Sequence, residues 1–156
     1  NAGEARSQGF EIETTYQLNE NLLFSMGGAY TNAELTRDEP LLNGFDGDRL
    51  PSSPDYTVNV GLQYEFELDG HASYVGGDYA YVSDFYNKLN ETGIKAGDYG
   101  QLNMSAGVVL NNFNVELFGH NLTNENALTH ADSALLDDRA YRLRPRTIGL
   151  NVGFQF

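Results

Sequence analysis

The last ten residues of the chain, 147–156, alternate strictly between two kinds of side chain. Even positions from Ile148 onward carry large apolar groups, and odd positions from Thr147 onward carry Thr, Gly, Asn or Gln. Successive side chains of a β-strand point to opposite faces, so this segment predicts a strand with one apolar and one polar face. Two environments suit such a strand. A soluble antiparallel sheet buries the apolar face in a core, whereas a transmembrane barrel turns it to lipid around a wet interior.

The same alternation recurs along the chain and predicts an all-β, antiparallel meander of about seven long strands. Their expected ranges are 7–18, 22–36, 55–68, 71–85, 98–110, a strand starting at 113, and the closing segment. Phasing of the fourth strand is the least obvious, and we expect Val75, Gly77, Tyr79 and Tyr81 on its apolar face with Asp78 opposite. Tight turns are expected at 19–21, 69–70 and 111–112, and long polar loops at 37–54, 86–97 and 127–143.

The lengths of these segments favour the membrane environment. Most of the expected strands have about 12 to 15 residues, which exceeds the usual soluble strand of about 5 to 6 and suits a tilted crossing of a bilayer. Short connections at one rim and long ones at the other are typical of transmembrane barrels, and aromatic residues near the strand ends fit interfacial girdles. The chain has no run of about 18 apolar residues, so no transmembrane helix is expected.

Composition excludes several classes of function. The chain carries 22 acidic and 9 basic residues, a net charge of −13, which argues against a nucleic-acid partner because phosphate binding needs clustered Lys and Arg. Its three histidines, His71, His120 and His130, lack the spacing of metal ligands. No Ser or carboxylate pair stands in a recognisable catalytic context, and there is no Cys. We therefore expect no enzyme, no cofactor and no metal site.

Three segments together resemble a known family. They are Gly44 to Thr57 (GFDGDRLPSSPDYT), Val115 to Glu125 (VELFGHNLTNE) and Arg144 to Phe156 (RPRTIGLNVGFQF). In this order and spacing they resemble the C-terminal part of a TonB-dependent outer-membrane receptor. The ending also resembles the recognition signal for barrel assembly, and the usual pattern fits Thr147, Gly149, Val152 and Phe154. Ending the signal at Phe156 instead would place Asn151 where glycine is expected, so its register stays open.

The resemblance implies a transmembrane β-barrel of about 22 strands around a plug, in the outer membrane of a Gram-negative bacterium. Seven strands are an odd number, and an open sheet would leave unpaired edges in lipid. We therefore expect residues 1–156 to be the C-terminal segment of the barrel domain, with the plug and earlier strands outside this chain. Expected partners are membrane lipid, lipopolysaccharide, the remaining barrel and plug, TonB acting through the plug, and the barrel-assembly machinery.

The function implied is active import of a scarce nutrient such as a siderophore, metal chelate, vitamin or oligosaccharide. The alternatives are a passive porin-like barrel and a soluble, secreted, lectin-like module. If Phe156 ends at the periplasmic face, the long loops face outside and supply the candidate ligand contacts. These are Phe45, Asp46, Asp48 and Arg49, then Tyr86, Asn87 and Lys88, and last Asp137, Asp138, Arg139 and Tyr141.

Two further sets of charged residues allow two interpretations each. Arg142, Arg144 and Arg146 occupy even positions, as Ile148 does. If the closing strand extends through them, they point outward with Ile148 and would meet lipopolysaccharide phosphates. If it does not, they are solvated arginines of a loop. The second set lies on the polar face, where it forms either a hydrated wall or a surface that pairs with Arg or Lys of the plug. It comprises Glu11, Glu13, Glu65, Glu67, Asp78, Glu116 and His120.

Overall fold

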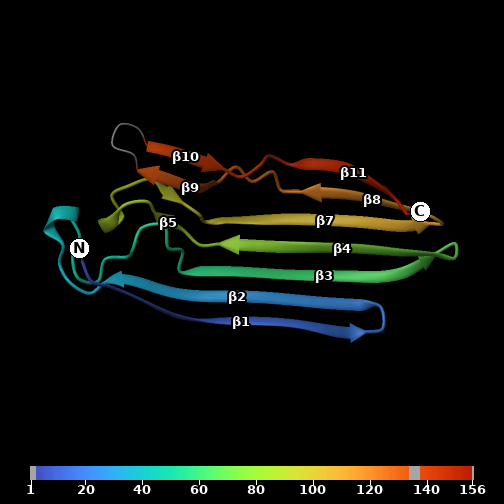
Figure 1. Ribbon diagram of the computed structural model, residues 1–156, viewed down its shortest axis with the longest axis horizontal. Coiled ribbons are helices and arrows are strands. Elements are labelled where there is room, and N and C mark those ends of the chain that lie inside the picture. The colour runs from blue at the N-terminus through green and yellow to red at the C-terminus, as the bar shows by residue number, and fades with distance from the viewer. Residues whose placement is uncertain (1–2, 134–137, 156) are drawn as a thin grey trace.

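The structure, a computed structural model, describes residues 3–133 and 138–155, with the backbone alone at 133 and 138. In these residues seven long strands lie side by side in one antiparallel sheet (Figure 1). They are β1 (Ala5–Asn19), β2 (Leu22–Leu35), β3 (Tyr56–Leu68), β4 (His71–Val82), β7 (Tyr99–Leu110), β8 (Phe113–His120) and β11 (Thr147–Phe154), in the order β1-β2-β3-β4-β7-β8-β11. The expected all-β meander is confirmed.

The shorter elements lie between these strands. Strand β5 (Phe85–Tyr86) pairs with β6 (Lys95–Ala96), β9 (Leu128–Ser133) pairs with β10 (Asp138–Arg142), and two 3-10 helices span Pro40–Leu42 (η1) and Leu89–Glu91 (η2). The interpretation of residues 127–143 as a polar loop is therefore wrong, because they contain a hairpin. Ala131, paired with Ala140 and 2% exposed, anchors the hairpin, and the polar residues around it hid the strand pattern. Among the described residues, no helix is long and apolar enough to cross a membrane.

The strand register places the large apolar side chains of the sheet on one face. Leu62 of β3 lies opposite Phe24 of β2 on one side and Gly77 of β4 on the other, which confirms the expected phase of the fourth strand. No second sheet lies over this face in the described part of the chain. Its side chains are instead exposed to the surroundings, among them Ile12 (52%), Leu62 (50%), Leu117 (55%) and Leu150 (62%). Leu62, Val108 and Phe154 thus do not meet in a dry interior between stacked sheets, as a soluble sandwich would require.

Aromatic pairs lie near both ends of this apolar face. Close to the long connections, the ring centroid of Tyr30 lies 5.8 Å from that of Phe10 and 5.1 Å from that of Tyr56. Close to the tight turns, the rings of Phe113 and Phe154 lie 5.0 Å apart. Two aromatic bands bordering an apolar band are the arrangement expected where strands cross both interfaces of a bilayer.

The buried apolar core of the described residues lies outside the apolar face, where the long connections meet. It comprises Ala33, Leu35, Phe85, Ala96 and Ala131. Leu35 ends β2, Phe85 begins β5, and Ala96 and Ala131 belong to β6 and β9. The connections are consequently packed against one another, although their polar composition suggested solvated loops.

The tight turn between β3 and β4 gives a first prediction about stability. Asp69 and Gly70 have φ values of 50° and 76°, and a two-residue hairpin turn of this kind requires positive φ at both positions. We expect Gly70→Val to lower the free energy of unfolding of the protein by about 1–2 kcal/mol, because a β-branched side chain disfavours positive φ. The measurement is urea unfolding in lipid vesicles. Gly28→Ala is the matched control, since a Cβ there lies 3.7 Å or more from its neighbours, and an equal effect of both changes would contradict the turn argument.

Candidate ligand-binding loops

Three long connections lie at one end of the sheet, and the tight turns lie at the other (Figure 1). We call the connections the first loop (36–55), the second loop (83–98) and the third loop (121–146). Every candidate ligand contact expected from the sequence falls in one of them. The structure shows how exposed each candidate is and which candidates contribute to the packing of the loops.

The first loop turns back and pairs with the end of β2. The backbone N–H of Leu35 donates to the carbonyl of Asp48 at 2.9 Å, and that of Leu50 donates to the carbonyl of Ala33 at 2.8 Å. Arg49 lies between these two hydrogen bonds, opposite Glu34. Its backbone is thus fixed to the sheet, and its side chain starts from a defined position.

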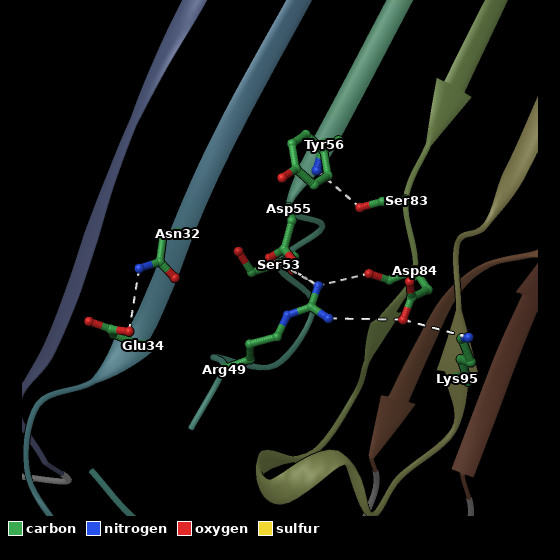
Figure 2. A network of polar contacts seen from close by, with 9 residues as sticks. All are labelled: Asn32, Glu34, Arg49, Ser53, Asp55, Tyr56, Ser83, Asp84 and Lys95. Carbon is green, nitrogen blue, oxygen red and sulfur yellow. Dashed lines mark hydrogen bonds and ion pairs between the residues drawn. The ribbon is translucent and has the colours of Figure 1, made fainter. Parts of the chain in front are cut away.

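Arg49 links the first loop to the segment that follows β4 (Figure 2). Its guanidinium Nη2 donates to the carbonyls of Asp84 at 2.8 Å and Ser53 at 3.2 Å, and lies 3.1 Å from the Asp55 carboxylate. Its Nη1 lies 3.9 Å from the Asp84 carboxylate, which also lies 3.6 Å from the ammonium of Lys95. With its side chain 26% exposed and several acceptors in place, Arg49 holds the two loops together, and its role as a ligand contact stays a prediction.

Of the remaining first-loop candidates, Asp48 is also occupied by local structure. Its carboxylate accepts the backbone N–H of Phe45 at 2.8 Å. Phe45 is 50% exposed and the Asp46 side chain is exposed, although the backbone N–H of Asp46 donates to Asp38 at 2.9 Å. Phe45 and Asp46 are therefore the most exposed candidates of this group.

In the second loop the three candidates lie in different environments. Asn87 is 8% exposed, and its side-chain oxygen accepts the backbone N–H of Ile94 at 2.7 Å, so it stabilises the loop. Tyr86 is partly exposed, and its backbone carbonyl accepts the N–H of Ser52 at 2.8 Å. Lys88 is exposed. Tyr86 and Lys88 are thus the more exposed candidates of a loop whose backbone is bonded to the first loop.

The third loop joins the second through a backbone hydrogen bond from Gly97 N–H to the carbonyl of Leu128, 2.8 Å long. Arg139 and Tyr141 of β10 are exposed, and the Tyr141 ring lies 6.0 Å from the ring of His130. Asp137 and the side chain of Asp138 lie outside the described residues. All three loops are thereby joined to one another at one end of the sheet.

The three arginines before the last strand do not follow the expected parity. Strand β11 begins at Thr147, so the condition that it extend through Arg142, Arg144 and Arg146 is not met, and Pro145, which has no N–H to donate, interrupts that segment. Nη1 of Arg142 donates to the carbonyl of Asn126 at 2.9 Å, and Nη1 of Arg146 to that of Leu122 at 3.4 Å. Their contact with lipopolysaccharide stays a prediction.

A buried asparagine at the end of β8 was not singled out by the sequence analysis. Asn121 is 1% exposed, and its Nδ2 donates to the carbonyls of Glu125 at 2.8 Å and Arg144 at 2.9 Å. Its Oδ1 accepts the N–H of Glu125 at 2.8 Å. One side chain thereby fixes the corner where the third loop leaves β8 and returns to β11. The available signal was the Asn-Leu-Thr-Asn segment, which contributed to the family resemblance without a role for its first residue.

The polar face of the sheet contains a second hydrogen-bonded group. The Glu116 carboxylate of β8 accepts hydrogen bonds from the Tyr74 hydroxyl of β4 and from Nδ2 of Asn151 of β11, the latter at 2.8 Å. Asp78 accepts Nδ2 of Asn103 at 2.8 Å. These carboxylates are engaged within the wall, and their pairing with a plug stays a prediction. Among the described His, Asp and Glu residues, no group of three or more is placed to hold a metal ion.

The expected assembly signal lies in the closing strand. Thr147, Gly149, Val152 and Phe154 are all part of β11, whose apolar positions Val152 and Phe154 are 61% and 50% exposed. Phe156 lies outside the described residues. Recognition by the assembly machinery stays a prediction.

A single-layer antiparallel sheet with an exposed apolar face, a polar opposite face and packed loops at one end defines a piece of a barrel wall. Residues 1–124 match the family described as TonB-dependent receptor-like, β-barrel. The chain belongs to this family.

Relatives and solved structures agree with that assignment. The chain is 33% identical over 106 residues to the metal-pseudopaline receptor CntO of Pseudomonas aeruginosa strain UCBPP-PA14. The aligned region covers 67% of the chain and 14% of that receptor. Its fold is similar to that of the ferric yersiniabactin uptake receptor FyuA from Yersinia pestis, with a TM-score of 0.86, 22% identity, and coverage of 100% of the chain and 24% of the receptor. It is also similar to BauA, the ferric preacinetobactin receptor from Acinetobacter baumannii, with a TM-score of 0.76, 21% identity, and coverage of 99% and 23%. The chain thus spans about a quarter or less of each of these proteins.

Proposed function

We propose that the chain forms part of the wall and three extracellular loops of an outer-membrane active transporter that imports a metal chelate. The observation that carries this proposal is membership of the TonB-dependent receptor family. The choice of a metal chelate over a vitamin or oligosaccharide is supported by the names of the three similar proteins, since each is named as a receptor for a metal chelate or its metal-binding compound. The passive porin and the soluble lectin-like module are not favoured by these relationships.

The loops offer groups that suit a chelate carrying both aromatic and charged parts. Phe45, Tyr86 and Tyr141 present ring surface, and Asp46, Lys88 and Arg139 add charges of both signs on the accessible side of the loops. Pockets for small molecules combine apolar and aromatic lining with a few placed polar groups. These six residues are therefore the proposed ligand contacts on this chain.

The two edge strands support the proposal that residues 1–156 are one segment of a larger barrel. Every residue of β1 is exposed, and β1 and β11 each have a strand neighbour on one side alone within the described sheet. Unpaired backbone groups in lipid cost several kcal/mol each, so both edges need further strands. We propose that these strands, the plug and the TonB-contacting segment belong to the rest of the receptor.

The test is energy-dependent uptake by cells. We expect deletion of the gene encoding the full receptor to abolish accumulation of at least one of three radiolabelled chelates: metal-pseudopaline, ferric yersiniabactin or ferric preacinetobactin. Complementation should restore accumulation in cells with TonB and fail in cells lacking it or treated with a protonophore. Uptake of the chelate that persists without TonB would contradict active transport and favour a passive barrel.

A further inference from the structure

The first and second loops are held together by more contacts than their polar sequences suggest. Between them lie the backbone hydrogen bond from Ser52 to Tyr86 and the contacts of the Arg49 side chain with Asp84. A Cβ added at Gly44 would meet Cδ1 of Leu35 at 2.6 Å and Cδ1 of Leu89 at 2.9 Å, so Gly44 lets the apolar tip of the second loop pack closely on the first.

Arg49 is the charged centre of this contact (Figure 2). The Asp84 backbone carbonyl and side chain belong to the second loop, whereas Ser53 and Asp55 belong to the first. A guanidinium is planar and offers five N–H donors in a fixed fork, which lets one side chain bind acceptors from both loops at defined angles. Lysine would retain the charge and lose this geometry.

Accessible ligand contacts stand on both sides of this link. Phe45 and Asp46 lie a few residues before Arg49 in the first loop, and Tyr86 and Lys88 follow Asp84 in the second. A ligand that touches both pairs binds more tightly when their relative position is fixed before binding, because less conformational entropy is then lost. The contacts of Arg49 therefore affect the affinity for a ligand, even though its side chain binds acceptors within the loops.

We propose that Arg49 is a positioning residue that locks the first and second loops into one preorganised unit for ligand capture. The part about ligand capture rests on the proposed function, whereas the locking of the loops stands on the contacts alone. Loss of the Arg49 side chain leaves the barrel wall intact and loosens the second loop relative to the first, while the Ser52–Tyr86 hydrogen bond remains.

Spin labels measure the locking directly in the full-length receptor. This chain contains no cysteine, so labels can be placed through Leu41→Cys in η1, where the side chain is 97% exposed, and Glu91→Cys in η2, which is exposed. We expect a narrow distribution of label-to-label distances in the parent, a clearly broader one in Arg49→Gln, and an intermediate one in Arg49→Lys. The matched control is Arg37→Gln, because Arg37 pairs with Glu4 and Glu39 and not with the second loop. A distribution in Arg49→Gln as narrow as in Arg37→Gln would overturn the proposal.

Ligand affinity of the purified receptor separates positioning from general destabilisation, and it is measured with whichever of metal-pseudopaline, ferric yersiniabactin and ferric preacinetobactin is taken up by cells with the parent receptor. Arg49→Gln should weaken binding by on the order of tenfold, with Arg49→Lys partly restoring it, while the thermal unfolding temperature of the barrel stays at the parent value. Unchanged affinity despite broadened distances would overturn the role in capture. If the parent takes up none of the three chelates and Arg49→Gln still broadens the distances, the proposed function fails and the locking of the loops stands.

Discussion

Replacing Leu62 by arginine is expected to destabilise the full-length receptor by about 2–4 kcal/mol, which is the effect of a cationic side chain on the lipid face of a barrel near the bilayer midplane. Leu62 lies in the middle of β3, is 50% exposed, and stands on the face between the two aromatic bands. Near the middle of a bilayer a guanidinium has no bulk water to solvate its charge. The measurement is urea unfolding of the receptor in lipid vesicles, followed by circular dichroism or heat-modifiable migration in gels.

The neighbouring residue supplies a control of opposite parity. Gln63 points to the polar face, where its Nε2 donates to the Glu65 carboxylate at 3.1 Å, so an arginine at position 63 would find water and a counter-charge. We expect Gln63→Arg to change the free energy of unfolding by less than about 1 kcal/mol, as is usual for exposed charges. Equal effects at the two positions would show that the two faces meet similar surroundings, and the membrane interpretation of the sheet would fail.

The long strands were predictable because their side-chain pattern has a short period. Alternation over ten or more residues fixes both the strand and its phase, so the expected ranges of β1 to β4 and β7 differ from the structure by at most a few residues. The pair Gly76-Gly77 obscures the alternation in β4. Its faces were nevertheless predicted correctly, with Tyr79 on the apolar face and Asp78 on the polar face. The tight turns were equally clear, because Asp69-Gly70 and Asn111-Asn112 contain residues that accept positive φ.

The loops were not predictable, because their order depends on contacts between segments distant in sequence. Arg49 looked like a free cation beside acidic neighbours, and only the chain reversal at the end of β2 brings it to Asp84, 35 residues away. The β9–β10 hairpin is similar, since Ala131 is buried by partners that no local pattern reveals. Sequence reasoning therefore located the long connections and did not identify the residues that hold them together.

The Asn121 corner illustrates the same limit and gives the second large prediction. Asn121 adopts φ = 50°, a conformation that asparagine tolerates better than most residues, and its side chain bonds three backbone groups while 1% exposed. Removing the amide leaves the carbonyls of Glu125 and Arg144 and the N–H of Glu125 without these partners. A hydrogen bond of this kind contributes about 0.5–1.5 kcal/mol net, so we expect the loss of three in Asn121→Ala to lower the free energy of unfolding by about 1.5–4.5 kcal/mol.

Three further substitutions separate the causes of this loss. Asn121→Gly retains the freedom to adopt positive φ and removes the hydrogen bonds alone, so it should lose about 1 kcal/mol less than Asn121→Ala. Asn121→Asp keeps an acceptor for the Glu125 N–H and turns a carboxylate oxygen toward two carbonyls, so it should be at least as unstable as Asn121→Ala. Asn114→Ala, in the exposed part of β8, is the control and should have little effect. Hydrogen exchange of the β11 amides reports on the corner locally, and parent-like protection of β11 in Asn121→Ala would show that this asparagine does not hold the last strand in place.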